Sequence, residues 1–188
     1  MSGDSQRRTR ALRMSAAGLW LGALIISGAT AAIAFPMMKQ LNPTLPGFAA
    51  YPGEHHRIAA GMIMARVFIA CDALQVVSAV LVLVAGLLAS RHRDHASIAS
   101  RLGWIAIGVA VLTLAAKLAL LDPIMRTELN AFWAAASSGS LIDAELHRAR
   151  FDALHPRASR IMVATAALVL GAIVAWIVSG LPRQSVNK

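Results

Sequence analysis

Cysteine and charged residues are scarce in this chain of 188 residues. Cys71 is the single cysteine, which excludes a disulfide within the chain and any metal motif built from several cysteines. Charged residues make up 14% of the sequence, against roughly 25% in a typical soluble domain, and acidic residues number only 9. Hydrophobic residues reach 57%, which is more apolar surface than one domain of this length can bury. We therefore expect lipid to cover part of the chain.

The net charge of +9 raises the question of a nucleic-acid partner. The basic residues, however, form neither a basic arm nor one amphipathic face, and many of them flank long apolar runs. Positive charge at such positions orients a protein in its membrane. We therefore expect the lipid bilayer as a partner, and no nucleic acid.

Four apolar runs have the length of membrane-spanning helices. Each approaches the ~20 residues that a helix needs to cross about 30 Å of hydrocarbon. Lipid cannot satisfy backbone hydrogen bonds, so these runs must be helical, and they are too long and too poorly alternating for barrel strands. They cover about residues 16–34, 67–89, 102–121 and 161–180. The sequence predicts an all-α fold: a polytopic membrane four-helix bundle that forms a single domain over residues 1–188.

The first run has a competing interpretation as a cleaved signal peptide. Arginines precede it, and Ala32-Ile33-Ala34 resembles a signal-peptidase site. The run is long for the apolar region of a signal peptide, which favours a retained span.

Basic residues also predict the orientation of the spans. With four spans, the two terminal segments and the loop between the second and third runs share one side. That side holds Arg7, Arg8, Arg10, Arg13, Arg91, Arg93, Arg101, Arg183 and Lys188. Basic residues on the other side are mostly mixed with acidic ones. Because positively charged loops stay in the cytoplasm, we expect an integral protein of a bacterial-type inner (plasma) membrane, with both termini cytoplasmic.

Two segments are expected on the outer side. Residues 36–57 hold four of the seven prolines and two glycines, which predicts a loop. Residues 124–154 are predicted to form an extra amphipathic helical segment between spans three and four. Asp122-Pro123 is expected to break or kink the third helix, and residues 137–139 are expected to form a turn.

After that turn, Ser140 with Asp143 resembles a helix-capping pair. The helix that follows is predicted to end at His155-Pro156. We expect its apolar stripe to lie flat on the membrane interface or across the mouth of the bundle. The stripe contains Ile142, Leu146, Ala149 and Ala153, and the polar face contains Glu145, Arg148 and Asp152.

Several short motifs carry a resemblance to a known family. They are Leu19-Trp20-Leu21-Gly22, Phe35-Pro36, Gly61 with Phe68, Asp122-Pro123, and Phe151 with Leu154-His155. The chain resembles, over roughly residues 12–180, the family of small four-helix membrane proteins typified by transmembrane protein 205. That family is defined as a domain of unknown function. The resemblance implies a bundle fold and supplies no reaction, and the proline-rich stretch 42–52 is longer than the family pattern.

Asp72 and Lys117 are charged residues within the second and third apolar runs. They lie about 23 and 22 residues from the centre of the loop that joins those runs, so an antiparallel hairpin places them at nearly the same depth. Gln75 shares a helix face with Asp72, and Thr113 shares one with Lys117. The spacing predicts an intramembrane charged pair. It could act as a proton or ion relay, or it could be a buried ion pair that fixes helix register, which we favour.

Histidines and methionines gather on the outer side and raise the alternative of a metal or haem site. Clustered thioethers and imidazoles suit copper, and two histidines can clamp a haem iron. Methionine is also an ordinary filler of apolar gaps, and no paired ligand spacing occurs. The candidate ligands are His56, His155 and Met62.

His155 is expected to face the bundle mouth, at a height similar to Arg66 and near His56 at the start of the second helix. These three residues form the predicted outer-mouth polar site. The imidazole either hydrogen-bonds a polar group there or ligates a metal or haem.

No nucleophile elbow, phosphate-binding loop or dinucleotide fingerprint occurs in the sequence. We therefore expect a non-enzymatic integral membrane protein, an accessory or interaction subunit that assembles with other membrane protein subunits. The alternative is a membrane protein that handles copper or haem.

Overall fold

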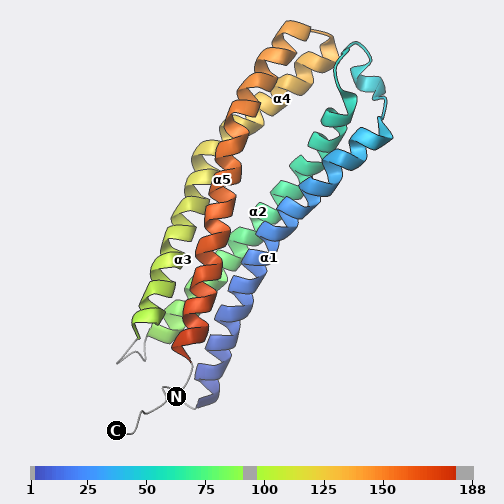
Figure 1. The fold of residues 1–188 in the computed structure, drawn as a ribbon. Helices are drawn as coiled ribbons and strands as arrows, with labels where there is room; N and C mark the ends of the chain where they lie inside the picture. Colours follow the sequence, from blue (N-terminus) through green and yellow to red (C-terminus); the bar gives the residue numbers. More distant parts are fainter. Residues whose placement is uncertain (1–2, 91–96, 181–188) are drawn as a thin grey trace, which may run out of the picture.

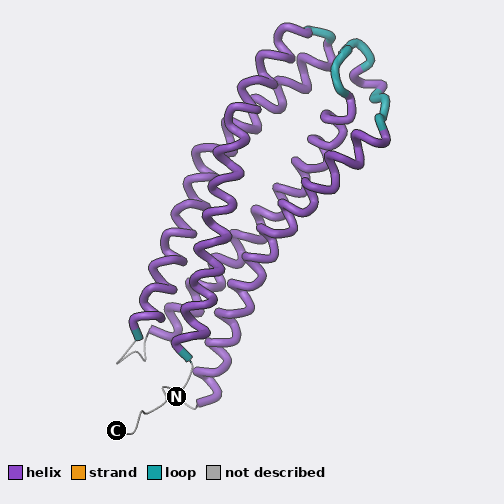
Figure 2. Tube along the Cα trace, in the orientation of Figure 1, coloured by secondary structure: helices purple, strands orange, loops and turns teal. Residues whose placement is uncertain are grey.

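The computed structural model describes residues 3–90 and 97–180, and these residues form an all-α fold without a strand (Figures 1 and 2). The helices are α1 (Gly3–Leu41), α2 (His55–Ser90), α3 (Ile98–Ala116), α4 (Asp122–Ser138) and α5 (Leu141–Ser179). A 3-10 turn, η1 (Pro46–Phe48), lies between α1 and α2, and a π-helical segment, η2 (Lys117–Leu121), joins α3 to α4. Four stretches are long and apolar enough to cross a membrane: Arg7–Leu41, His55–Leu88, Ile98–Ser138 and Leu141–Ser179. The predicted four-helix fold is confirmed.

The helices form two long antiparallel pairs that lie close together near the beginning of α1, separate farther along, and meet again at the opposite tip (Figure 1). α1 packs along α2, while α3 and α4 pack along α5, and α1 also contacts α5. The beginning of α1 and the end of α5 lie at one end, here called the proximal end. The loop 42–54, which contains η1, and the α4–α5 turn lie at the opposite, distal end, where Figure 2 draws loop segments.

The helices are much longer than the apolar runs they contain. α1 and α5 have 39 residues each, or about 58 Å of helix, against about 30 Å of hydrocarbon. The distal half of α5 is rich in charged residues and belongs outside the hydrocarbon. The fold therefore has a distal extension, which consists of the end of α1, the beginning of α2, all of α4 and the first half of α5.

Two predicted helix boundaries are wrong. Residues 36–57 were predicted as a loop, yet α1 continues through Pro36 to Leu41 and α2 begins at His55. His155-Pro156 was predicted to end a helix, yet α5 passes through it. A proline removes one backbone hydrogen bond from a helix, yet both helices continue through their prolines, α1 beside α2 and α5 beside α3 and α4.

The α4–α5 connection follows the prediction in part: the turn is at Gly139, but Ser140 makes no side-chain hydrogen bond that caps the backbone of α5. Gly139 ends α4 with a φ of 79°, a left-handed conformation that glycine adopts without strain. Ser140 precedes α5, and its hydroxyl donates to Asp143 at 2.7 Å.

The predicted orientation of the amphipathic segment is wrong. α5 does not lie flat. It continues the bundle direction and packs on α4, with fully buried Ala144 in one apolar cluster with Phe132 and Ala136 of α4. The apolar stripe faces outward instead, with Ile142 84% and Leu146 46% exposed. Polar contacts from Glu145 and His147 to neighbouring elements hold the opposite face inward.

Two apolar clusters form the core. The proximal cluster centres on Trp20 and Trp176 and is filled by alanines and branched residues of α1, α2, α3 and α5. The distal cluster contains Tyr51, Ile58, Phe132, Ala136 and Ala144. A layer of buried polar side chains lies near the distal edge of the proximal cluster and is the candidate site described next.

Candidate functional site

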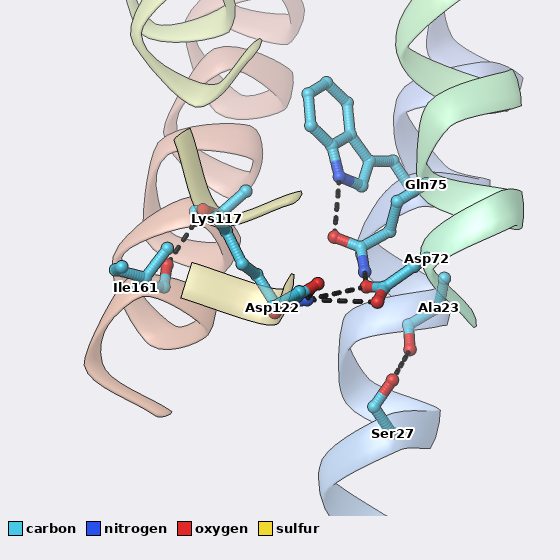
Figure 3. Close-up of polar contacts among 9 residues, drawn as sticks. Ala23, Ser27, Asp72, Gln75, Lys117, Asp122 and Ile161 are labelled. Atoms are coloured by element: carbon cyan, nitrogen blue, oxygen red, sulfur yellow. Dashed lines mark hydrogen bonds and ion pairs between the residues drawn. The ribbon is translucent and has the colours of Figure 1, made fainter. Parts of the chain in front are cut away.

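Asp72 on α2 and Lys117 at the start of η2 are in contact, as their matching depth predicts. Lys117 Nζ donates to Asp72 Oδ1 at 2.9 Å and to Asp72 Oδ2 at 3.0 Å (Figure 3). The two side chains are only 7% and 10% exposed. Charges in such surroundings are stable only when they are paired and hydrogen-bonded, and the two-pronged contact meets that condition.

Asp122 is the third charged member of the site, and its place there was not predicted from the sequence. Its Oδ2 accepts a hydrogen bond from Lys117 Nζ at 2.8 Å, and its side chain is 12% exposed. In an α-helix, residues five apart point about 140° away from each other. The π-helical segment instead places Asp122 one wide turn beyond Lys117, with the Asp122 backbone N–H donating to the Lys117 carbonyl.

Pro123 explains the position of this wide turn. Its nitrogen carries no hydrogen, so it cannot donate to the carbonyl of Ala119, and its ring would crowd that carbonyl in a regular α-helix. Widening the turn relieves the clash without breaking the helix. The signal in the sequence was a lysine followed five residues later by aspartate and proline.

Neighbouring polar side chains complete the layer. Gln75 Nε2 donates to Asp72 Oδ1 at 3.1 Å, and Trp20 Nε1 donates to Gln75 Oε1 at 3.3 Å (Figure 3). The chain of contacts thus reaches from α1 through α2 to η2 and α4. Thr113, expected on the same helix face as Lys117, shares a hydrogen bond of 3.1 Å with Thr165 on α5.

The charges within the site do not balance. One ammonium serves two carboxylates, which leaves a formal charge of −1 when both are ionised. Lys117 is tied to Asp122 within its own helical rod and to Asp72 on the other helix pair. The arrangement can therefore lock the two helix pairs together, and it leaves Lys117 with a remaining partner if the contact to Asp72 is lost.

The predicted outer-mouth site of His155, Arg66 and His56 is not assembled. His155 is exposed, and its ring contacts Phe151 with centroids 5.8 Å apart. Among the described residues its imidazole has no hydrogen-bond partner, which contradicts the hydrogen-bonded form of the prediction. His155 lies only about 20° from buried Ala144 around the axis of α5, so its exposure does not follow from the phase of the helix. Arg66 is also exposed on α2.

The candidate metal ligands are likewise dispersed. Met62 is 37% exposed on α2, His56 lies at the start of α2, and His155 lies on α5. Within residues 3–90 and 97–180, no group of three or more His, Cys, Asp and Glu side chains is placed to share one ion.

Two histidines not chosen as site residues have structural partners. His55 Nδ1 accepts from the Leu45 backbone N–H at 3.0 Å, so its Nε2 carries the proton and donates to the Tyr51 carbonyl at 2.9 Å. His147 Nδ1 lies 2.7 Å from Glu128 Oε2 and ties α5 to α4. These contacts account for imidazoles that the sequence alone left open to metal binding.

Tyr51 fastens the loop 42–54 to the α4–α5 pair. Its side chain is buried, its ring meets Phe132 edge-on at 5.9 Å, and its hydroxyl donates to Glu145 at 3.0 Å. Burial, and then the hydrogen bond to the Glu145 carboxylate, raise the pKa of Tyr51 above its ordinary value of 10.0. The distal ends of the two helix pairs are thus joined through this tyrosine.

Comparisons with known proteins add no relative: no family model, curated protein or solved structure matches the chain.

Proposed function

We propose that this chain is a non-enzymatic integral membrane protein that acts as an accessory or interaction subunit of a larger membrane assembly. The observation that carries the proposal is the outward-facing apolar stripe of α5. Ile142 lies 19 residues before the apolar run of α5, or about 28 Å beyond the hydrocarbon. The headgroup layer is only about 5–7 Å thick, so lipid does not cover this residue.

The surroundings of the stripe support the proposal. Ile142 and Leu146 stand on a helix whose other face is fixed by Ala144 packing and by the contacts of Glu145 and His147. The stripe is therefore held outward on a rigid element rather than on a loop. Exposed apolar side chains on such a rigid element, at a height that lipid does not reach, fit an interface with another membrane subunit.

The test replaces the stripe with charge. In native membranes, the wild-type chain should migrate with an assembly larger than itself, and I142E/L146E should release it. The matched control, N130E/A134E, adds two carboxylates to exposed positions of α4 on the same hairpin and should leave the assembly intact. A photo-crosslinker at position 142 then identifies the neighbour, which could be a second copy of the chain. Equal migration of all three proteins at the size of a monomer would refute the proposal.

The alternative of copper or haem handling predicts a different result for the purified protein. Metal analysis and an absorption spectrum would show stoichiometric copper or a haem band. That result, lost in His56→Ala or His155→Ala, would replace the interaction proposal.

We also propose that the membrane is a bacterial-type inner membrane and that both termini face the cytoplasm. The support is the four spans, together with the basic residues of the two terminal segments and of the segment 91–101, which have few acidic residues among them, whereas the basic residues of the other side are mixed with acidic ones. Single cysteines introduced into the two tails on a Cys71→Ser background should resist an impermeant thiol reagent in intact cells. Labelling of either tail would reverse the assignment. The resemblance to the transmembrane protein 205 family stands as part of the same proposal and adds no reaction to it.

A further inference from the structure

The basic residues of the distal extension divide by height into two groups. Heights can be taken along each helix from the end of its apolar run, at 1.5 Å per residue. Arg57, Arg148 and Arg150 lie about 15 Å or more beyond the hydrocarbon. A lower group lies within about 8 Å of it and contains Lys39, Arg66, Arg126, Arg157 and Arg160, here called the basic belt.

The upper arginines have protein partners. Arg57 pairs with Glu54 at 2.6 Å, Arg148 with Glu145 at 2.7 Å, and Arg150 approaches Glu128 at 3.8 Å. Each arginine of the upper group therefore has a carboxylate of the protein close to it.

The cations of the basic belt have no such carboxylate partners. All five of its side chains are exposed, and among the described residues none has a carboxylate within 4.0 Å. The one carboxylate at belt height is Asp122, and its Oδ2 is already bonded to Lys117. The belt draws on α1, α2, α4 and α5, so it surrounds the bundle rather than lining one groove.

The height of the belt matches the phosphate layer of a bilayer, which occupies about 5–7 Å beyond the hydrocarbon on each side. We propose that the basic belt binds anionic lipid headgroups, with phosphate oxygens taking the place of the missing carboxylates. Arg157 and Arg160 are three residues apart on one face of α5 and can hold one phosphate together. The same belt explains why so many cations lie on the side opposite the termini, where the positive-inside rule does not call for them.

The experiment compares two triple variants in reconstituted vesicles. R66Q/R157Q/R160Q removes three belt cations, and R57Q/R148Q/R150Q removes three upper cations from the same side. Spin-labelled phosphatidylglycerol and phosphatidylcholine report the preference of the first lipid shell for the anionic headgroup. Cations of the proximal end contribute equally to all three proteins.

The belt variant should lose the preference by about fivefold for each lipid site that loses an arginine, the equivalent of ~1 kcal/mol per cation near an anionic surface. The upper variant should keep the wild-type preference. Equal losses in both variants would mean a general effect of net charge, and no loss in either would mean that the belt binds no lipid. Either result overturns the proposal.

Two further arms keep the test decisive. R157K/R160K retains the charge and should retain most of the preference. If the belt triple variant does not fold, R157Q against R148Q makes the same comparison. Inorganic phosphate added to phosphatidylcholine vesicles at constant ionic strength should not raise the melting temperature. A rise abolished by R157Q/R160Q would reassign the site to free phosphate.

Discussion

Lys117 Nζ and Asp122 Oδ2 meet at 2.8 Å although the residues are five apart in one continuous helical rod. A regular α-helix would point the two side chains about 140° apart. The π-helical turn before Pro123 makes the contact possible, and it gives Lys117 a second carboxylate besides Asp72.

This double pairing predicts unequal costs for single neutralisations. Lys117→Gln leaves two buried carboxylates without their cation and should approach ~3 kcal/mol of destabilisation, the lower figure for breaking a buried pair. Asp72→Asn should cost clearly less, because Lys117 keeps Asp122. D72N/K117Q should recover much of the loss, and adding D122N should recover most of the rest. Denaturant unfolding in detergent measures each value. Equal costs for D72N and K117Q would mean that Asp122 does not serve as the second partner.

Two glycines allow close packing of the proximal tryptophans. A Cβ at Gly103 would lie 2.5 Å from Trp176 Nε1, and one at Gly86 would overlap the ring of Trp104. Gly103→Ala should therefore destabilise the protein by about 1–3 kcal/mol through overpacking. Gly108→Ala is the control, because open space surrounds that site in the same helix. It should be neutral or stabilising, since alanine favours helix by about 1 kcal/mol over glycine. Thermal unfolding compares the two variants, and a stable G103A would contradict the packing.

Tyr51 is the only tyrosine, so tyrosinate absorbance titrates this one group. Its folded-state pKa is raised by burial and by Glu145, and the native titration should lie above the denatured one, which should fall near 10.0. The unfolded chain then loses its proton at a lower pH than the folded chain. Stability from Tyr51 is therefore full below pH 10 and falls as pH rises from there through the folded pKa.

Glu145→Gln should lower the native pKa of Tyr51 partway toward that of the denatured chain, because burial remains. Tyr51→Phe should cost about 1 kcal/mol at neutral pH and remove this alkaline loss of stability. If Tyr51 titrated at the same pH in the native and the denatured protein, its hydroxyl would be exposed to water and the expected burial would be contradicted.

Replacement of His55 and of His155 by alanine should have very different effects on stability. His55→Ala removes the two hydrogen bonds of the imidazole to the loop 42–54, with the Leu45 N–H and the Tyr51 carbonyl, at about 1 kcal/mol each. His155→Ala should stay within about 0.5 kcal/mol of wild type, because the ring is exposed. Melting temperatures in detergent compare them. A larger loss from H155A would point to a polar partner for that imidazole.

The sequence by itself determined which segments form apolar helices and how many there are. The free energy of transferring a helix into lipid is a sum over neighbouring residues. A window of the sequence is therefore enough to identify a membrane-spanning helix. It also determined the contact of Asp72 with Lys117, because depth in a hairpin follows from counting residues.

Only the tertiary structure decided how the helices are rotated and where they continue. The phase of α5 is set by Ala144 against its neighbours, and this turns Ile142 outward although the sequence favoured the reverse. Asp122 joined the charged site through a local change of helix type. Rotation about a helix axis depends on contacts with residues far away in the sequence, and no local pattern records them.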